Sequence, residues 1–403
     1  MPKIIIREKD YTSAGDRAYD NFAVLVPGFA KEDASCFDEE GVYEVSTQKD
    51  FIENVGLVPY ETEVEGVKLT TSYGNKIAYE LLGLGYTILY KKIEDVTDIT
   101  FNNLKPLIDK STYDFRYIVT GLIGDQSANE AIRALAHFDE TTDDPFETGR
   151  GECTALCDVE IDKAGTVTGA PATASKYAAY FAPSFCMWNY KGPKEGENYV
   201  YSNNVFPASF YYLACAKKAR LNNFDEWFAV AGYTRGIADF NIESTAVKVG
   251  EILVNKLQPR NNAGDFEGPA VNLITNIRGN FYLWGNRTAE ALREDNLIAS
   301  HFLNIRQLCS TIKKQVYVAC RRFTFDPNSE VLWINLCNAI TPMLEKMKAN
   351  QGIEDYIIEQ VETPEKAKLM AKIRIIPIEA VEDFELELAL EDSFGMASAT
   401  ITE

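Results

Sequence analysis

Residues 116–138, RYIVTGLIGDQSANEAIRALAHF, combine a strand and a helix in one short stretch. The first part, RYIVTGLIG, is rich in Val and Ile, and a turn containing Gly and Asp follows it. The second part carries Ala, Ile and Leu at helical spacing. A buried strand that leads through a short turn into a helix is the repeating unit of an α/β sheet. This stretch therefore predicts an α/β body.

Other stretches repeat or extend the same unit. FAVLVPGFA (22–30) and TILYKKI (87–93) are predicted to be buried strands, and the segments QKDFIENVG and YGNKIAYELLGLG between them are predicted to be helical. CTALCDVEI (153–161) resumes a strand. SKYAAYFAPSFCMW (175–188) is predicted to begin as a helix and to end extended.

Composition limits the possible functions. The chain has 403 residues and a formal charge of −20, and such a charge argues against nucleic acid as the main partner, because phosphate binding needs clustered Lys and Arg. No run approaches the roughly 18 apolar residues that span a bilayer. The first ten residues, MPKIIIREKD, lack the apolar region of a secretion signal. We therefore expect a soluble protein of two or three domains.

The basic residues are concentrated in one helical region. Residues 301–350 hold seven basic and three acidic side chains, a local charge of +4, so the rest of the chain carries −24. Within 297–322, apolar residues recur every three or four positions, which predicts an amphipathic helix. Another side of this helix gathers four basic residues within an arc of about 100°: Arg306, Lys313, Lys314 and Arg321. Such a face predicts an acidic partner surface, with an ordinary solvated face as the alternative.

A second helix should follow. FDPNSE (325–330) supplies a turn in which Asn328 or Ser329 can cap the helix that continues through VLWINLCNAI. Pro342 should kink this helix or lie near its middle under strain.

The sequence offers little support for catalysis. Its two histidines, His137 and His301, are expected to be structural, and it contains neither a G-x-S-x-G elbow nor a Walker A loop. None of the eight cysteines forms C-x-x-C, and Cys153 and Cys157 lie in a predicted strand. We expect buried free thiols, with disulfides between subunits as an open alternative. No metal or cofactor is expected.

Both ends of the chain have the pattern of unpaired strands. Ile4, Ile5 and Ile6 form a short apolar run near the amino terminus. Near the carboxyl terminus, apolar residues alternate strictly with Asp383, Glu385 and Glu387. These apolar residues are Phe384, Leu386, Leu388 and Leu390. Strict alternation is typical of a strand with one buried face, and such a strand needs a neighbour.

GPAVNLITNIRGNFYLWGNRT (268–288) resembles the tail sheath proteins of contractile bacteriophages and related contractile injection systems. The matching positions are Asn272, Ile277, Gly279, Trp284, Gly285, Arg287 and Thr288. FLNIRQLCSTIKKQV (302–316) is similar to the helix that follows in that family. FDPNSEVLW (325–333) resembles the family's next turn at Phe325, Pro327, Asn328, Leu332 and Trp333. The sequence departs from the family pattern at Phe206 and Val230, where the family has proline.

The resemblance implies an α+β protein with an α/β core, in which helices flank mixed sheets and β-arms extend from both ends. It implies an N-terminal arm (1–20), an outer α/β body (21–267), an inner α+β domain facing a tail tube (268–371) and a C-terminal strand or arm (372–403). The isoleucines and the alternating segment described above would donate strands to neighbouring subunits, and the four basic residues would face the tube.

The implied function is structural. Sheath subunits polymerise as stacked hexameric rings around a tail tube and contract to drive the tube through a target envelope. The implied partners are other copies of the chain, the tube protein, and baseplate and terminator proteins, without nucleic acid or membrane insertion. The implied location is the virion tail, after assembly in the host cytoplasm. The alternatives are a cytosolic, hydrolase-like α/β enzyme and a self-assembling shell or binding protein unrelated to sheaths.

Overall fold

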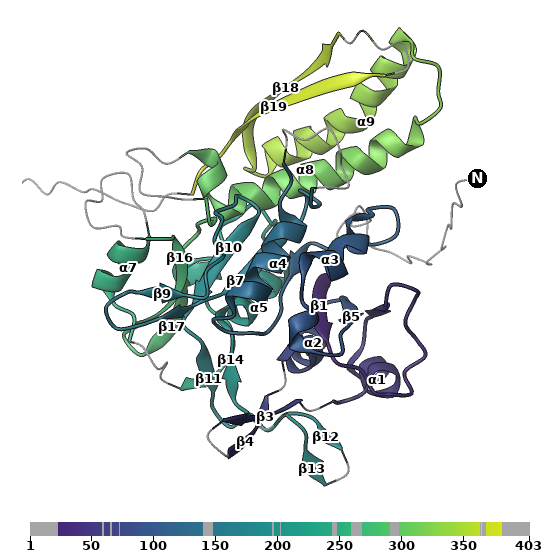
Figure 1. The fold of residues 1–403 in the computed structure, drawn as a ribbon. Helices are drawn as coiled ribbons and strands as arrows, with labels where there is room; N and C mark the ends of the chain where they lie inside the picture. The colour runs from purple at the N-terminus through teal and green to yellow at the C-terminus, as the bar shows by residue number, and fades with distance from the viewer. Residues whose placement is uncertain are drawn as a thin grey trace, which may run out of the picture.

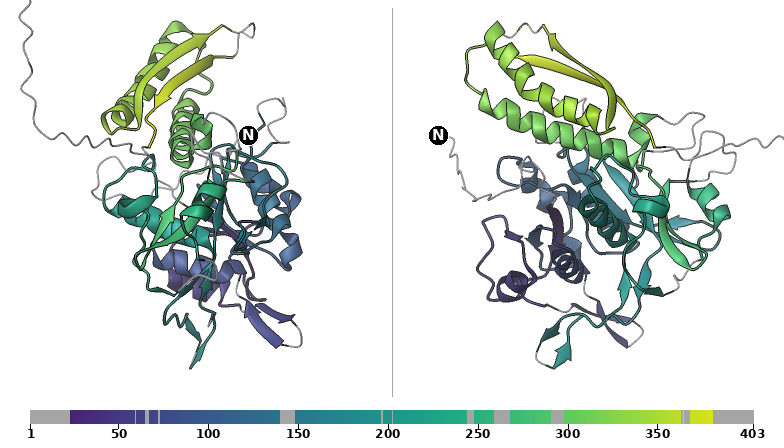
Figure 2. Two further views of the ribbon diagram at one scale, coloured as in Figure 1. Left: turned by 90° about the vertical axis from the view of Figure 1, so that its left-hand side faces the viewer. Right: turned by 180° about the vertical axis from the view of Figure 1, so that it is seen from behind.

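The chain folds into a large α/β body and a smaller α+β unit at one end of it (Figures 1 and 2). The structure is a computed structural model. It describes residues 23–58, 60–64, 67–71, 73–139, 148–195, 197–201, 203–243, 248–258, 268–290, 298–362, 364 and 368–380.

An eight-stranded sheet forms the centre of the body. Its strand order is β17-β16-β10-β7-β6-β1-β5-β2. The six inner strands run parallel, and β17 and β2 join antiparallel at the two edges. The strands are β1 (Val24–Gly28), β2 (Val42–Val45), β5 (Ile88–Lys92), β6 (Tyr117–Ile118), β7 (Thr154–Asp158), β10 (Ala178–Ala182), β16 (Val271–Ile277) and β17 (Asn280–Trp284). Strands β1, β7 and β10 are buried along their whole length, as expected for parallel strands covered on both faces.

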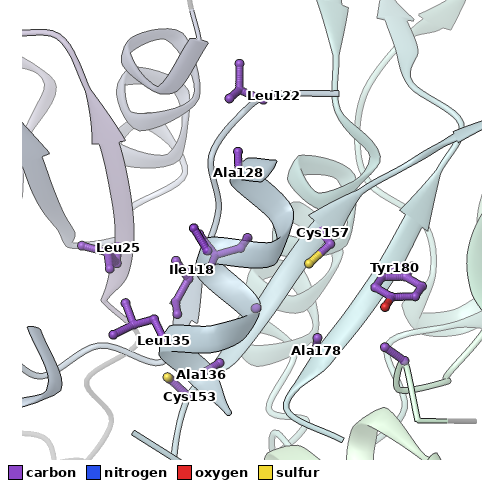
Figure 3. Close-up of a cluster of buried hydrophobic side chains, with 14 of the residues drawn as sticks. Leu25, Ile118, Leu122, Ala128, Leu135, Ala136, Cys153, Cys157, Ala178 and Tyr180 are labelled. Atoms are coloured by element: carbon purple, nitrogen blue, oxygen red, sulfur yellow. The ribbon is translucent and has the colours of Figure 1, made fainter. Parts of the chain in front are cut away.

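Helices cover both faces of this sheet. One face packs on α4 (Gln126–Ala136) and α7 (Glu251–Leu257), and Figure 3 shows Leu135 of α4 beside Ile118 of the sheet. The other face packs on α2 (Tyr73–Gly83) and α5 (Ala208–Leu221). Each fully buried Leu or Ile contributes roughly 1.5–3 kcal/mol, so these two layers supply most of the stability of the body.

Carboxylates at strand and loop ends fix two of these helices. Asp125 caps α4, because its Oδ1 accepts a hydrogen bond of 3.0 Å from Ala128 N. Asp158, the last residue of β7, accepts bonds from Ser209 N (2.8 Å) and Ser209 Oγ (2.6 Å) at the start of α5. Burial raises the pKa of Asp158 to about 7, despite these bonds. The end of β7 is therefore tied to the amino terminus of α5.

The smaller unit consists of two long helices and a hairpin. Helix α8 (Leu303–Arg322) leaves the body, α9 (Glu330–Ala349) returns beside it, and the hairpin of β18 (Ile353–Val361) and β19 (Met370–Pro377) packs on α9. Ser329 caps α9 as predicted, and Pro342 lies inside that helix. The core of this unit includes Leu308, Ile312, Leu336, Ile340 and Leu344.

Short elements make up the rest of the described chain. They are α1 (Gln48–Asp50), a π-helix (Phe51–Val55), β3 (Tyr60–Val64), β4 (Val67–Thr71), α3 (Phe101–Leu104), β8 (Glu160–Ile161), β9 (Val167–Thr168), β11 (Phe185–Met187), β12 (Lys194–Glu195), β13 (Asn198–Tyr199), β14 (Val205–Phe206), α6 (Gly232–Arg235), β15 (Ile242–Glu243), and 3-10 turns at Val96–Asp98, Lys105–Ile108 and Ala299–His301. Among the described helices, none combines the length and the hydropathy needed to span a bilayer.

The predicted mixed α/β architecture is confirmed, and one detail is corrected. The prediction of a helix at the start of 175–188 is wrong, because Ala178–Ala182 forms the buried strand β10 between β7 and β16. The domain boundaries stay a prediction; β16 and β17, which follow the predicted boundary at 268, complete the body sheet. A boundary at 372 would cut through β19, which pairs with β18 from Met370 onward.

Candidate assembly surface

The β18–β19 hairpin is a two-stranded sheet with open edges. Tyr356 and Ile358 pair with Ile375 and Ile373, and these four side chains pack toward α9. On the other face, large apolar side chains remain partly exposed: Ile357 (52%), Met370 (47%) and Ile376 (54%). Among the described strands, β18 and β19 pair only with each other. Each strand therefore presents one row of backbone N–H and C=O groups that another strand can pair with.

The predicted strand donors lie outside the described residues. Ile4, Ile5 and Ile6 precede the first described residue, and Phe384, Leu386, Leu388 and Leu390 follow the last one. Their role as donors stays a prediction. A sheet of only two strands is marginally stable alone, and in the described part the packing on α9 supports the hairpin while both of its edges stay open.

A buried polar seam attaches α8 to the body. Arg116, which precedes β6, donates to Gln307 O (2.6 Å), Gln307 Oε1 (2.9 Å) and Thr311 Oγ1 (2.7 Å) of α8. Gln307 also donates to Thr154 Oγ1 of β7 at 3.0 Å, and Thr311 Oγ1 donates to Glu226 Oε1 at 2.7 Å. Hydrogen bonds from three separate segments of the body therefore fix one turn of α8.

Glu226 supplies the negative charge in this seam. Its Oε1 lies 3.9 Å from Arg116 Nη1, and its Oε2 pairs with Arg220. Burial alone would raise the pKa of Glu226, but the positive charges of Arg116 and then Arg220 outweigh burial, and the pKa is lowered. The carboxylate is therefore ionised at neutral pH and compensates the buried guanidinium of Arg116.

The basic residues of α8 divide into two groups. Arg306 is buried and stacks on the ring of Tyr177, with 4.7 Å between the guanidinium carbon and the ring centroid. Lys314 pairs with Asp114 and donates to Phe115 O at 2.9 Å, and burial lowers its pKa. Lys313 and Arg321 are exposed, although Lys313 also reaches Gly151 O at 3.2 Å. The expectation of an exposed basic face is therefore wrong for Arg306 and Lys314, which attach α8 to the body.

The motif residues 272–288 connect the body sheet to α8. Asn272 Nδ2 donates to Tyr180 O (3.1 Å) and Arg287 O (2.9 Å), and Asn272 Oδ1 accepts from Arg287 N (2.8 Å). Thr288 Oγ1 donates to Ser300 O at 2.9 Å, just before α8. The side chain of Arg287 is buried over the ring of Phe302. These contacts hold the chain that leaves β17 against the sheet.

The backbone conformation explains why glycine stands at positions 279 and 285, and limited space adds a second reason at 285. Gly279 has φ +91 in the turn of the β16–β17 hairpin. Gly285 has φ +154, and a Cβ there would lie 2.1 Å from Gln258 Nε2. Only glycine fits both the backbone and the space at position 285.

Three further motif residues lie in the smaller unit. Pro327 is exposed in the turn between α8 and α9. Asn328 Nδ2 donates to Lys368 O at 3.4 Å, which ties this turn to the start of β19. Trp333 packs against the hydrophobic core of the smaller unit. Trp284, the other motif tryptophan, packs against the hydrophobic core of the body. The motif residues therefore stabilise the fold of the subunit through contacts within the chain.

Replacing Asn272 by Ala should destabilise the subunit by about 3 kcal/mol, because one buried N–H and two carbonyls lose their partner. Chemical denaturation of the unassembled protein measures this change. Asn280→Ala is the matched control, because Asn280 is exposed at the start of β17, and the control should change the free energy of unfolding by less than about 0.5 kcal/mol. Equal stability of the two variants would contradict the assigned role of Asn272.

The chain itself fills the crevice where α/β enzymes commonly bind ligands. That crevice lies at the carboxyl end of β1, where β5 and β6 flank it on opposite sides. Asn75 Oδ1 accepts from Phe29 N at 2.9 Å, and Tyr90 Oη donates to Phe29 O at 2.7 Å. A Cβ on Gly28 would lie 2.2 Å from Tyr90 Oη. Side chains of the protein itself therefore occupy this position.

Both histidines form hydrogen bonds to other residues of the fold. His137 Nδ1 lies 2.9 Å from Ser175 Oγ, but Ser175 is only 2% exposed and also accepts from Tyr177 N. Burial lowers the pKa of His137. His301 is buried, and its Nδ1 accepts from Ile298 N. A substrate cannot reach Ser175 from solvent, so this His–Ser pair gives no support to the enzyme alternative.

The cysteines of the described part are free thiols. The expectation of buried thiols holds for Cys153, Cys157 and Cys215, and burial raises the pKa of Cys153 to about 12. It is wrong for the other five, because Cys36, Cys186, Cys309 and Cys337 are only partly buried. Cys320 on α8 is exposed.

Comparison with known proteins identifies the fold. No family model and no curated protein sequence matches this chain. Among solved structures, a chain of the anti-feeding prophage baseplate has a TM-score of 0.65 at 14% identity, and covers 97% of this chain and 99% of its own length. A chain of the PVC sheath complex, an extracellular contractile injection system in its contracted state, has a TM-score of 0.62 at 15% identity and covers 97% and 98%.

A third structure is the helical sheath of the anti-feeding prophage in its contracted state. It has a TM-score of 0.62 at 16% identity and covers 97% of this chain and 99% of that one. The likeness extends over nearly the whole length in both directions. The chain therefore has the fold of contractile injection system sheaths.

Proposed function

We propose that this chain is a structural subunit of a contractile sheath, which polymerises as stacked hexameric rings around a tail tube and contracts to drive the tube through a target envelope. The near-complete overlap with sheath chains carries the proposal. It is supported by the filled crevice at β1, which argues against an α/β enzyme.

The proposed polymer is linked by strand exchange. Ile4–Ile6 of one subunit and Phe384–Leu390 of another would add strands to the open edges of β18 and β19 in a third. In this mode of recognition, backbone hydrogen bonds provide attachment and alternate apolar side chains fix the register. The exposed Ile357 and Ile376 offer apolar surface beside these edges.

The proposed partners are other copies of the chain, the tail tube protein, and baseplate and terminator proteins. The proposed location is a tail or injection apparatus assembled in the host cytoplasm. Neither nucleic acid nor a membrane is a proposed partner, and the proposed role is not enzymatic.

Electron microscopy of the purified protein tests the proposal. Concentrated protein should form striated hollow tubes in negative stain, because a sheath subunit carries the contacts for its own polymer. Particles that stay dispersed over a hundredfold range of concentration, while remaining folded by circular dichroism, would contradict the proposed function.

The tube contact can be tested with charge reversal on α8. We propose that Lys313 and Arg321 face an acidic tube exterior, since both are exposed. Arg306 and Lys314 are left out of this proposal because the body covers most of each side chain, whereas Lys313 stays exposed although it also donates to Gly151 O. Lys313→Glu with Arg321→Glu should abolish loading of the sheath onto purified tubes, without changing the melting temperature by more than a few degrees. Single exposed ion pairs are weak, so the effect should weaken at high salt.

A charge-matched control separates this contact from net charge. Lys163 and Lys191 are exposed on the body. Reversing both to Glu adds the same charge and should leave loading intact. Normal loading of the α8 variant would exclude these residues from the tube contact.

A further inference from the structure

The two strands of the β18–β19 hairpin carry charges of opposite sign. All charged residues of β18 are acidic: Glu354, Asp355 and Glu359. Both charged residues of β19 are basic: Lys372 and Arg374. Asp355 is paired with Lys348 of α9 at 2.9 Å. Because each strand has one open edge in the described part of the chain, the hairpin presents one acidic edge and one basic edge.

Three of these charges lie on the outer face of the hairpin, which points away from α9. Tyr356 and Ile375 are paired in the register and pack toward α9. Side chains alternate between the two faces of a strand, so Glu359 and Lys372, another pair in the register, lie on the outer face together with Arg374. Arg374 pairs with Glu359, whereas exposed Lys372 forms no ion pair with another described residue. Lys372 is therefore available to an acidic strand at the open edge of β19.

The two predicted donor segments also differ in charge, as their sequences show. The acidic arm, residues 383–390, holds three acidic side chains and no basic one: Asp383, Glu385 and Glu387. The basic arm, residues 3–9, holds three basic side chains and one acidic one: Lys3, Arg7, Lys9 and Glu8. In a strand whose apolar face packs toward α9, the residues that alternate with Leu386 or with Ile4 lie on the outer face. The acidic row of one arm and the basic row of the other would therefore stand beside the charges of the hairpin.

Both arms begin beside the smaller unit. The last described residue, Ala380, lies three residues after the end of β19. At the other end of the chain, Ala23 O accepts a hydrogen bond of 2.8 Å from Arg116 N, and the side chain of Arg116 donates to Gln307 of α8. Arms that leave the subunit here can reach the hairpins of neighbouring copies while every copy keeps the same distance from the axis of the proposed polymer.

Charge distinguishes the two possible arrangements of the arms. Side chains that stand opposite one another on one face of paired strands lie about 4.5–5.5 Å apart, where opposite charges attract and like charges destabilise the pairing. At the edge of β19, the acidic arm meets Lys372 and Arg374. At the edge of β18, it would meet Glu359. The basic arm has the opposite preference, so like charges disfavour the exchanged arrangement at both edges.

We propose that charge sorts the two arms between the two edges of the hairpin. The acidic arm of one neighbouring subunit pairs with β19, beside Lys372 and Arg374, and the basic arm of another pairs with β18, beside Glu359. The order in the completed sheet is then basic arm, β18, β19, acidic arm. This inference rests on the proposed strand exchange and names the residues that select the arm at each edge.

Photo-crosslinking in assembled tubes identifies the edge that each arm takes. A photoreactive phenylalanine analogue replaces Ala389 in one variant and Ile5 in another, because both positions are uncharged and alternate with the apolar face of their arm. The analogue at position 389 should crosslink to residues 370–377 of another copy at least roughly fivefold more often than to residues 353–361, since β19 lies between it and β18. The analogue at position 5 should show the opposite preference. Tubes assembled from isotopically labelled and unlabelled chains reveal, by mass spectrometry, which crosslinks join two copies.

Charge reversal with rescue tests the cause of the sorting. Neutral substitutions remove only a weak attraction, so the test uses reversal, which adds repulsion. Lys372→Glu with Arg374→Glu should raise the lowest protein concentration that yields tubes by roughly tenfold or more, because the acidic arm then meets like charges. Adding Glu385→Lys with Glu387→Lys restores opposite charges and should return that concentration to within about threefold of the wild-type value.

Two matched controls accompany the rescue. Lys3→Glu with Arg7→Glu, added to the reversed hairpin in place of the acidic-arm substitutions, should give no rescue because it changes the other arm. Lys163→Glu with Lys191→Glu makes the same change in net charge as the hairpin reversal, but on the body, and should leave assembly unchanged.

The outcomes separate the sorting of the arms from the proposed function. Tubes in which the analogue at position 389 labels β18, or labels both strands equally, would overturn the sorting and leave the sheath proposal standing. A folded reversed hairpin that the reversed acidic arm does not rescue would do the same. The crosslinks are measured on the wild-type hairpin, so they decide the matter even where a reversed hairpin fails to fold. A wild-type chain that forms no tubes at any concentration would overturn the proposed function and the sorting with it.

Discussion

Deleting residues 381–403 should leave a folded subunit that no longer polymerises. The cut falls after β19 and after the last described residue, so the hairpin and its packing on α9 remain complete. The deleted segment contains Phe384, Leu386, Leu388 and Leu390, the proposed donors. The monomer should therefore keep its melting temperature within a few degrees, while tubes disappear from negative-stain images.

The expected loss is complete because each arm binds weakly alone. Burying four large apolar side chains gains roughly 6–12 kcal/mol. Ordering seven residues costs roughly 7–14 kcal/mol of backbone entropy. A single arm therefore gains little, and the polymer depends on many arms that act together in a closed lattice. Removing one arm from every subunit removes this cooperation throughout.

Substitutions within the arm provide a matched pair. Leu386→Glu with Leu388→Glu places charge on the apolar face, and should prevent polymerisation as the deletion does. Glu385→Gln with Glu387→Gln changes the other face and should leave tubes intact. Tubes formed by the truncated protein, seen by microscopy and by sedimentation, would refute the exchange of this arm.

Local patterns predicted most of the elements. The unit 116–138 contains β6 and α4, and the Asp125 cap explains where α4 begins. The apolar stripe in 297–322 predicted α8, and Ser329 marks the start of α9. Each of these signals depends on residues close together in the sequence, so the structure could not easily depart from them.

The errors have a common physical cause. Ala178–Ala182 was predicted as helical because a short apolar run fits either a buried helix or a buried strand, and only pairing with β7 and β16 decides between them. The basic arc was correct in angle but wrong for Arg306 and Lys314, because helical spacing cannot reveal which face the body covers. The seam itself was missed, since Arg116, Glu226 and Gln307 are far apart in sequence.

The seam also bears on the proposed mechanism. In the proposed sheath, strand exchange would let subunits move while they stay connected, and force would pass between the body and the unit that contains α8. Arg116, Gln307 and Thr311 join the two through buried hydrogen bonds. A rigid joint here would confine movement to the contacts between subunits, because tightly packed parts shift as units.

Arg116→Ala should therefore destabilise the subunit by about 3–5 kcal/mol. The substitution removes one of the two arginines that pair with the buried carboxylate of Glu226 in the ion pairs described above, and Arg220 remains. Chemical denaturation at pH 7 measures the loss, and Arg321→Ala, an exposed arginine on α8, should change stability by less than about 0.5 kcal/mol. Because the pKa of Glu226 is lowered in the folded protein, its ionised carboxylate stabilises the wild type at pH values above the ordinary pKa of a carboxyl group. This stabilisation is lost as the pH falls through the lowered pKa. The difference between wild type and Arg116→Ala should therefore narrow in acid. A difference that stays constant from pH 7 to pH 3 would show that the charge of Glu226 does not contribute, and that Arg116 acts only through its hydrogen bonds to the neutral acceptors of α8.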